Sequence, residues 1–89
     1  MFVVHPRISV RHPEISEGDV IHAWENALRS ASRLPDKPDE YIAVGFDSNG
    51  RLLEVVAVRG QDGKWLAFHA MTPPSSKTFK ELGIKRKGK

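Results

Sequence analysis

The chain has 89 residues, of which 39% are hydrophobic and 28% charged, and it contains no cysteine. These values fit one small globular domain and exclude a disordered chain, disulfides and thiolate metal sites. No stretch approaches the roughly 18 consecutive apolar residues of a membrane span, and the N-terminus lacks the basic and apolar regions of a signal peptide. We therefore expect a cytoplasmic protein with no membrane partner.

The first half of the chain predicts one long helix between irregular segments. Residues 2–4, FVV, are expected to form a short strand before Pro6. A helix is then predicted from about Glu17 to Ser30, because Ser16 is a favourable N-cap and Asp19 completes a capping box. Apolar residues recur through it at helical spacing, namely Val20, Trp24, Ala27, Leu28 and Ala31.

The segment after this helix carries two prolines and three acidic residues. Residues 30–33, SASR, are expected to form a short edge strand, and residues 34–40, LPDKPDE, a loop. Three strands follow at residues 40–47, 51–59 and 64–71. Asn49-Gly50 and Asp62-Gly63 separate them, and such pairs are typical of hairpin turns. We expect an antiparallel meander.

Two features close the chain. A short helix is expected after the sequence TPPSS, with Ser75 or Ser76 as its N-cap and Gly83 as its stop. The last five residues, KRKGK, carry four positive charges, whereas the net charge of the whole chain is only +3. Such a tail is either a solvated end or a non-specific contact for phosphates. The expected organisation is one domain, residues 1–84, and a basic tail, residues 85–89.

Two-residue turns would fix which side chains share a face of the sheet. They would place Phe46, Val44 and Ile42 opposite Leu53, Val55 and Ala57, as one apolar face under the helix. An odd-length loop with a bulge would reverse this parity. The second face would then carry Tyr41, Ala43, Glu54, Val56, Val58, Trp65, Ala67, His69 and Met71. Its two ionisable groups within the strands, Glu54 and His69, are expected to have Cβ atoms roughly 5–8 Å apart.

The expected fold class is therefore α+β. An antiparallel sheet of three to four strands is packed by an N-terminal helix, and a short C-terminal helix follows. Three segments of this chain resemble BrnT-like toxins of type II toxin–antitoxin systems: RHPEISEGDVIHAW, EYIAVGFDSNGRLLEVVAV and FHAMTPPSSKTFKEL. The similarity covers about residues 11–82. It implies a RelE-like fold, cleavage of RNA, and a cognate DNA-binding antitoxin as partner.

The resemblance also implies roles for individual residues. Arg11 and His12 match the basic-His pair before the family's first helix, and Arg51 matches the arginine after its hairpin turn. Arg59 lies where the family is often polar or basic. The family's Ser-Ala-Arg triplet is replaced by residues 69–71, HAM, so that methionine stands in place of the arginine. The segment before Arg11 is also shorter than in the family.

Metal-independent cleavage of RNA needs a base, an acid and cations that stabilise the charge on the phosphate. The residues suited to catalysis are His69, Glu54, Arg51 and His12. Those suited to binding RNA are Arg11, Arg59, Tyr41, Trp65 and Lys77, because aromatic rings stack on unpaired bases and cations bind phosphates. No cofactor is expected, and four scattered histidines without a carboxylate cluster make a poor zinc site.

Simpler interpretations stay open. His69 and Glu54 are also explained as a structural pair, Trp65 as a packing residue, and Arg51 as a residue that merely follows a turn. Two alternatives to the toxin follow from this. One is an RNA-binding or protein-binding module of the same fold without catalysis, which Met71 favours. The other is a structural homodimer joined through the half-apolar second face of the sheet.

Overall fold

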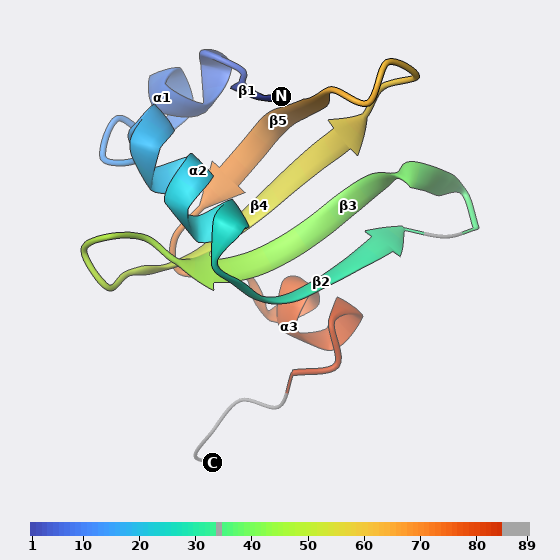
Figure 1. The fold of residues 1–89 in the computed structure, drawn as a ribbon. Coiled ribbons are helices and arrows are strands. Elements are labelled where there is room, and N and C mark those ends of the chain that lie inside the picture. Colours follow the sequence, from blue (N-terminus) through green and yellow to red (C-terminus); the bar gives the residue numbers. More distant parts are fainter. Residues whose placement is uncertain (34, 85–89) are drawn as a thin grey trace.

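The structure is a computed structural model, and it describes residues 1–33 and 35–84. The elements occur in the order β1 (Phe2–Val4), α1 (Arg7–Arg11), α2 (Glu17–Glu25), β2 (Ala27–Arg33), β3 (Lys37–Phe46), β4 (Leu52–Arg59), β5 (Trp65–Met71) and α3 (Ser76–Glu81). The strands form one sheet in the order β1-β5-β4-β3-β2 (Figure 1). The α+β class is confirmed. The expected basic tail, residues 85–89, lies outside the described residues.

The sheet is larger and more mixed than expected. It has five strands, and β1 pairs in parallel with β5, whereas the other neighbours are antiparallel. Strand β1 is the expected FVV segment, and α3 is the expected C-terminal helix. Helix α1 was not expected from the sequence. It lies between β1 and α2 in the chain and packs Ile8 into the core.

Helix α2 begins as expected and ends earlier. Ser16 and Asp19 form the capping box, with both hydrogen bonds present. The helix stops at Glu25, so the predicted extension to residue 30 is wrong. The following residues instead form β2, which pairs with β3. Without β2, the backbone N–H and C=O groups along this edge of β3 would have no hydrogen-bond partners. Leu28, from the second half of the predicted stripe, lies at an irregularity of this pairing and is 59% exposed.

Strand β3 starts within the segment expected to be a loop. It begins at Lys37 and includes Pro38, which has no N–H to donate to a neighbouring strand. The pairing with β2 is irregular at this point, between Ser32 and Arg33. The carbonyl of Pro38 accepts a hydrogen bond from the hydroxyl of Ser32, at 2.7 Å. The proline is therefore tolerated at a break in the ladder.

Both hairpin loops are one residue longer than the two-residue turns expected. Asp47 pairs with Arg51 across the first loop, and Gly60 pairs with Lys64 across the second. Each loop thus has three residues and ends in a glycine with positive φ, 83° at Gly50 and 80° at Gly63. A three-residue loop with its last residue left-handed is a common hairpin connection that favours glycine.

The extra residue reverses the faces of β3 relative to β4. Val44 lies opposite Glu54 and Ile42 opposite Val56, so the expected single apolar face is wrong. In β5 a bulge at residues 68–69 changes the register again, and beyond it Val56 lies opposite His69 and Val55 opposite Ala70.

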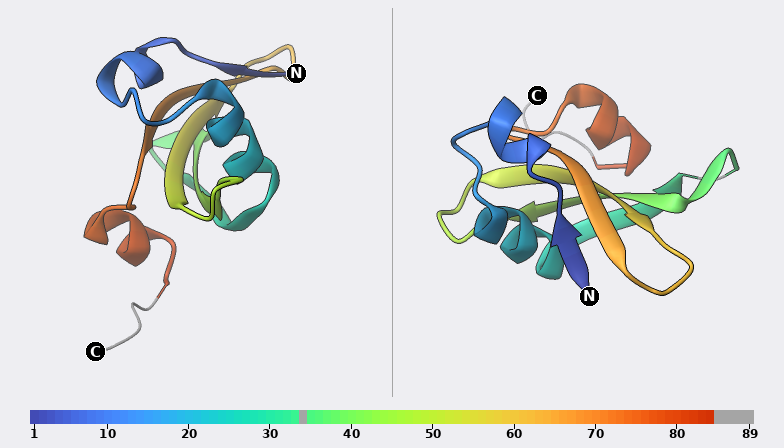
Figure 2. Two further views of the ribbon diagram at one scale, coloured as in Figure 1. Left: turned by 90° about the vertical axis from the view of Figure 1, so that its left-hand side faces the viewer. Right: turned by 90° about the horizontal axis from the view of Figure 1, so that it is seen from above.

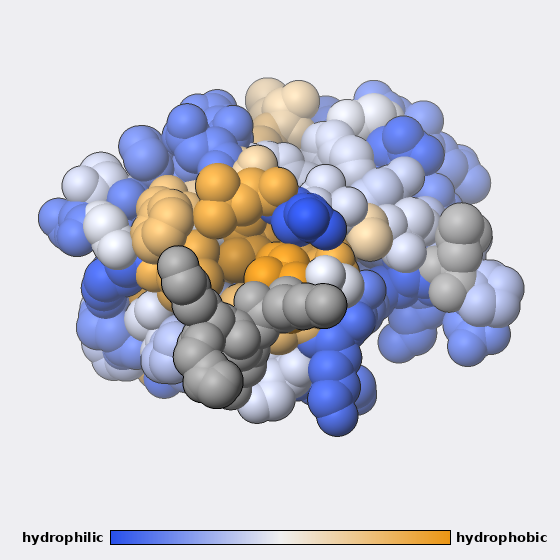
Figure 3. Space-filling view, turned by 90° about the horizontal axis from the view of Figure 1, so that it is seen from below, coloured by the Kyte–Doolittle hydropathy of each residue, from blue (hydrophilic) through white to orange (hydrophobic). Residues whose placement is uncertain are grey.

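Two small cores result, one on each face of the sheet. The face under α2 buries Ile8, Ile15, Val20, Ala23, Leu53, Val55, Ala57, Ala67 and Ala70. The face under α3 buries Ile42, Val44, Val56 and Leu82. Figure 2 shows α2 and α3 on opposite sides of the sheet. The α3 face stays partly open, and Figure 3 shows hydrophobic residues gathered there.

Candidate functional site

The site is centred on a histidine–carboxylate pair between β4 and β5. Nε2 of His69 lies 2.7 Å from Oε2 of Glu54. His69 lies opposite Val56, and Glu54 lies opposite Met71, so the two residues are diagonal neighbours on the α3 face. The sequence prediction that they meet is confirmed, although the rest of that face differs from the prediction.

Glu54 is held by three donors. Oε1 accepts hydrogen bonds from the Thr78 hydroxyl at 2.6 Å and from the Ser75 backbone N–H at 2.9 Å, and Oε2 accepts from His69. Burial leaves the residue only 5% exposed and by itself raises its pKa. The hydrogen bonds from His69, Thr78 and Ser75 outweigh burial and lower the pKa of Glu54 to about 2. The carboxylate is therefore ionised at neutral pH.

This charge fixes the tautomer of His69. An ionised carboxylate can only accept, so the proton of the neutral imidazole must be on Nε2. Nδ1 then carries a lone pair, and it has no hydrogen-bond partner within residues 1–33 and 35–84. The side chain is 36% exposed, so the imidazole is accessible to a bound molecule. Glu54 itself is fully engaged, and its role is to orient the imidazole rather than to act as a base.

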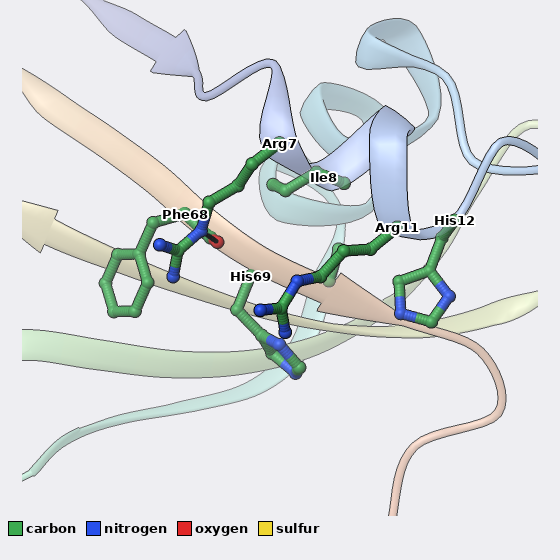
Figure 4. A pocket seen from close by; sticks show the side chains of 7 residues that line it. Arg7, Ile8, Arg11, His12, Phe68 and His69 are labelled. Atoms are coloured by element: carbon green, nitrogen blue, oxygen red, sulfur yellow. Dashed lines mark hydrogen bonds between the residues drawn. The ribbon is translucent and has the colours of Figure 1, made fainter.

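A small pocket of about 20 Å³ lies beside His69. Its lining consists of Arg7, Ile8, Arg11, His12, Phe68, His69 and Ala70. Figure 4 shows both arginines of α1 extending over β5, Arg11 toward His69 and Arg7 toward Phe68. This volume has room for about one water molecule, so the pocket suits a single compact group and not a whole nucleotide. Its two arginines and two histidines favour an anion.

The two arginines are held differently. Nε of Arg7 donates to the Phe68 carbonyl at 3.0 Å, and its guanidinium lies 5.7 Å from the centroid of the Phe68 ring. Arg7 therefore attaches α1 to β5 while its remaining N–H groups stay available. Arg11 makes no hydrogen bond or ion pair within the part of the chain that the structure describes. Its guanidinium is free to bind an anion with two parallel hydrogen bonds.

His12 follows the last turn of α1 and supplies a second imidazole to the same pocket. Its Nδ1 lies 3.5 Å from a carboxylate oxygen of Glu14, and about a third of its side chain is exposed. The structure thus brings His12, Arg11 and His69 together from segments nearly sixty residues apart in the chain, as the sequence prediction required. Arg7 joins them and was missed.

A weak signal for Arg7 was present in the sequence. Arg7 and Arg11 are four residues apart, which places them on one face of a helix. Pro6 directly before them is compatible with a helix start, because proline lacks only an N–H that the first turn does not use. The segment is short, and no cap or apolar stripe distinguishes it from a loop.

Arg51 has a different location from the one expected of a catalytic residue. It follows the β3–β4 turn and bonds Asp47 at 2.8 Å, Asp19 at 3.1 Å and the Glu14 carbonyl at 3.0 Å. Burial of Asp47 favours its neutral form, but hydrogen bonds from Arg51 and Asn49 outweigh burial and lower its pKa. Arg51 therefore joins the hairpin to the start of α2 and does not line the pocket at His69.

The aromatic residues expected to bind RNA also lie elsewhere. Tyr41 pairs with Ala57 on the α2 face, so it lies on the opposite side of the sheet from His69. Its ring contacts Trp65 edge-on at 5.2 Å, and Trp65 in turn contacts Trp24 at 5.3 Å. The guanidinium of Arg59 lies 5.8 Å from the Trp65 ring and 5.9 Å from the Tyr41 ring. This arrangement packs β3, β4, β5 and α2 together.

Lys77 is separate again. It lines an open hollow of about 280 Å³ with Arg33, Asp36, Lys37 and Glu81. Arg33 is paired there with Glu81 at 2.9 Å and with Glu40 at 2.7 Å. The cations of this hollow are balanced by neighbouring carboxylates, so it attracts anions less than the pocket at His69.

Two further properties bear on the chemistry. Among residues 1–33 and 35–84, no group of three or more His, Asp or Glu side chains is arranged to hold a metal ion. No helix in this described part is long and apolar enough to span a membrane.

Comparison of the chain with models of protein families, with curated proteins and with solved structures finds no match.

Proposed function

We propose that this chain is a BrnT-like toxin with a RelE-like fold, an endoribonuclease that cleaves RNA without a metal ion or cofactor. Its expected location is the cytoplasm, and its expected partner is a cognate DNA-binding antitoxin. One observation carries the proposal. His69, oriented by an ionised Glu54, faces the same pocket as Arg7, Arg11 and His12.

The proposed reaction is an intramolecular transfer at a phosphodiester. Nδ1 of His69 removes the proton of a ribose 2′-hydroxyl, and the resulting oxygen attacks the adjacent phosphorus. The new O2′–P bond forms as the P–O5′ bond breaks. Protonated His12 donates its proton to the departing O5′. The products are a 2′,3′-cyclic phosphate and a 5′-hydroxyl end, and no oxidant, reductant or added nucleophile is required.

The arginines of α1 supply the charge stabilisation. The phosphate gains negative charge on its non-bridging oxygens as the 2′-oxygen adds, and guanidinium groups bind such oxygens in pairs. The resembled family has an arginine where this chain has Met71. Arg7 and Arg11 line the pocket beside His69, so α1 supplies the positive charge that position 71 lacks.

A cleavage assay tests the chemistry. A 5′-labelled single-stranded RNA and a DNA of the same sequence are incubated with the purified protein in excess chelator. We expect RNA fragments ending in 2′,3′-cyclic phosphate and intact DNA, because DNA lacks the attacking hydroxyl. His69→Gln should lower the rate by about 100-fold or more, as for loss of a general base. His22→Gln, a histidine outside the pocket, should cleave normally. Equal cleavage by His69→Gln would refute the mechanism.

Expression in bacteria tests the toxin role separately. The wild-type chain should arrest growth, and His69→Ala should relieve the arrest. A small neighbouring reading frame with a DNA-binding pattern should restore growth when co-expressed. If the wild-type chain cleaves RNA in vitro but leaves growth unaffected, the ribonuclease proposal stands and the toxin proposal fails.

Two observations favour alternatives within the same fold. Met71 in place of the family arginine favours an RNA-binding or protein-binding module without catalysis. Such a module would bind RNA with steep salt dependence and yield no fragments. The second observation is that Phe46 and Leu66 on the α3 face are 45% and 36% exposed. That favours a homodimer, which light scattering would detect as a stable doubling of mass.

A further inference from the structure

A continuous chain of hydrogen bonds connects α3 to His69. Ser75 caps α3, and its Oγ accepts the N–H of Thr78 at 3.2 Å. The hydroxyls of Ser75 and Thr78 are 3.1 Å apart, and the Thr78 hydroxyl reaches Oε1 of Glu54 at 2.6 Å. Glu54 then accepts from His69 through its other oxygen. The path runs from the cap of a short helix to the proposed catalytic imidazole.

The direction of each bond follows from the charge on Glu54. A carboxylate only accepts, so the Thr78 hydroxyl must donate its proton to Oε1. Its oxygen is then left to accept from the Ser75 hydroxyl. The backbone N–H of Ser75 supplies the second donor to Oε1. Three donors therefore point toward Glu54: the Thr78 hydroxyl, the Ser75 N–H and His69 Nε2. Within the described residues no buried side-chain polar atom lacks a partner.

Thr78 itself lies outside the pocket at His69. It is 3% exposed and does not line the pocket that contains His69, Arg7, Arg11 and His12. Two charged residues of α3, Lys77 and Glu81, line the hollow at Arg33 and so face elsewhere. The hydroxyl of Thr78 makes its hydrogen bonds with Glu54 and with Ser75, the cap of its own helix. An effect of Thr78 on chemistry must therefore pass through Glu54.

We propose that Thr78 is a positioning residue for His69, acting through Glu54; this rests on the proposed ribonuclease function. The Thr78 hydroxyl keeps the buried carboxylate ionised and aimed at Nε2, so that Nδ1 of His69 stays open to the pocket. The packing of α3 on the sheet therefore also sets the orientation of the catalytic imidazole.

The test compares two matched substitutions. Thr78→Val removes the hydroxyl that donates to Glu54, and Thr78→Ser restores one. Thr72→Val is the control, because the Thr72 hydroxyl makes a bond of similar length, 2.7 Å, to the backbone carbonyl of Leu52 instead. If Thr78→Val does not fold, Thr78→Ala removes the same hydroxyl without adding a methyl group.

Two spectroscopic measurements need no RNA. Carbon NMR of the Glu54 carboxyl group follows its titration, and we expect Thr78→Val to raise its pKa by about one unit, as for loss of a hydrogen bond to a charged form. Proton–nitrogen spectra follow the His69 Nε2–H, which should be protected in the wild type and Thr78→Ser and broadened by exchange in Thr78→Val. Thr72→Val should match the wild type in both.

The kinetic measurement tests the catalytic consequence. Thr78→Val should lower kcat about tenfold with KM unchanged, the size expected for one hydrogen bond to a charged group. Thr78→Ser should recover most of the rate. If Thr78→Val leaves the Glu54 titration and the His69 signal unchanged, or if Thr72→Val alters them equally, the positioning role is overturned.

The outcomes separate this proposal from the proposed function. If the wild type cleaves RNA and Thr78→Val cleaves it equally well, the positioning role fails and the ribonuclease stands. If the wild type does not cleave RNA but Thr78→Val shifts both spectroscopic signals, the ribonuclease fails and the control of His69 by Thr78 stands.

Discussion

Replacement of Glu54 by glutamine should change how the stability of this protein depends on pH. The ordinary glutamate pKa is 4.5, and that of Glu54 in the folded chain is about 2. A carboxylate whose pKa is lowered on folding stabilises the protein above its unfolded pKa. That stability is lost as the pH falls from 4.5 toward 2. Glutamine does not titrate, so Glu54→Gln should lack this component of acid sensitivity.

The magnitude follows from the difference between the two pKa values. The side chain is only 6% exposed, so water screens it little, and the full difference is at most about 3 kcal/mol. Between pH 7 and pH 4 the wild type should lose about 1 kcal/mol through Glu54, and by pH 3 about 2 kcal/mol. Glutamine keeps one accepting oxygen for Thr78 and Ser75, so the variant should still fold.

Urea unfolding followed by tryptophan fluorescence at pH 7, 5, 4 and 3 measures this loss. The wild type and Glu54→Gln should differ in the slope of unfolding free energy against pH below pH 5. Glu17→Gln removes an exposed carboxylate from the first turn of α2 and is the matched control. If the wild type and Glu54→Gln profiles are parallel down to pH 3, Glu54 is not held ionised by its three donors and the reasoning about the His69 tautomer fails.

Three further predictions concern other parts of the molecule. A Cβ at Gly45 would collide with the Ala23 carbonyl oxygen where α2 crosses β3, so Gly45→Ala should lower the unfolding free energy by about 2 kcal/mol in urea. Arg51→Gln leaves the buried Asp47 carboxylate without its ion pair and should cost about 3 kcal/mol by the same measurement. RNA cleavage by the folded Arg51→Gln variant should stay unchanged, and a loss of kcat would restore Arg51 as a catalytic residue. Arg11→Gln should reduce the slope of log RNA affinity against log salt by about 0.7, measured by fluorescence anisotropy; an unchanged slope would rule out a phosphate contact there.

The sequence predicted best those features that are decided within a few residues. Ser16 and Asp19 cap α2 because their side chains reach backbone N–H groups three positions away. Glycine at positions 50 and 63 marked both hairpins, because a left-handed residue is needed at the end of each loop. Glu54 and His69 meet as expected only because the bulge at residues 68–69 offsets the additional residue of the β4–β5 loop.

The face of the sheet on which each side chain lies was harder to predict. One additional residue in the β3–β4 loop moved Ile42 and Val44 to the α3 face, although the central residues of β3 and β4 were correctly predicted as strand. Tyr41 moved to the α2 face for the same reason, and Trp65 moved there because the β4–β5 loop also has one additional residue. Asn49-Gly50 fits both a two-residue and a three-residue loop, so the local sequence did not choose between these registers.

The sequence by itself determined the α+β class and the hairpins, because caps, turns and strand alternation act over short separations. The meeting of Glu54 with His69 also needed the bulge in β5, which the sequence did not indicate. Only the tertiary structure decided that α2 ends at Glu25, because the following residues form β2 and pair with the edge of β3. It also placed Arg7 in the pocket beside His69 and Thr78 against Glu54. Those contacts join segments far apart in the chain, and they depend on how α1 and α3 pack against the completed sheet.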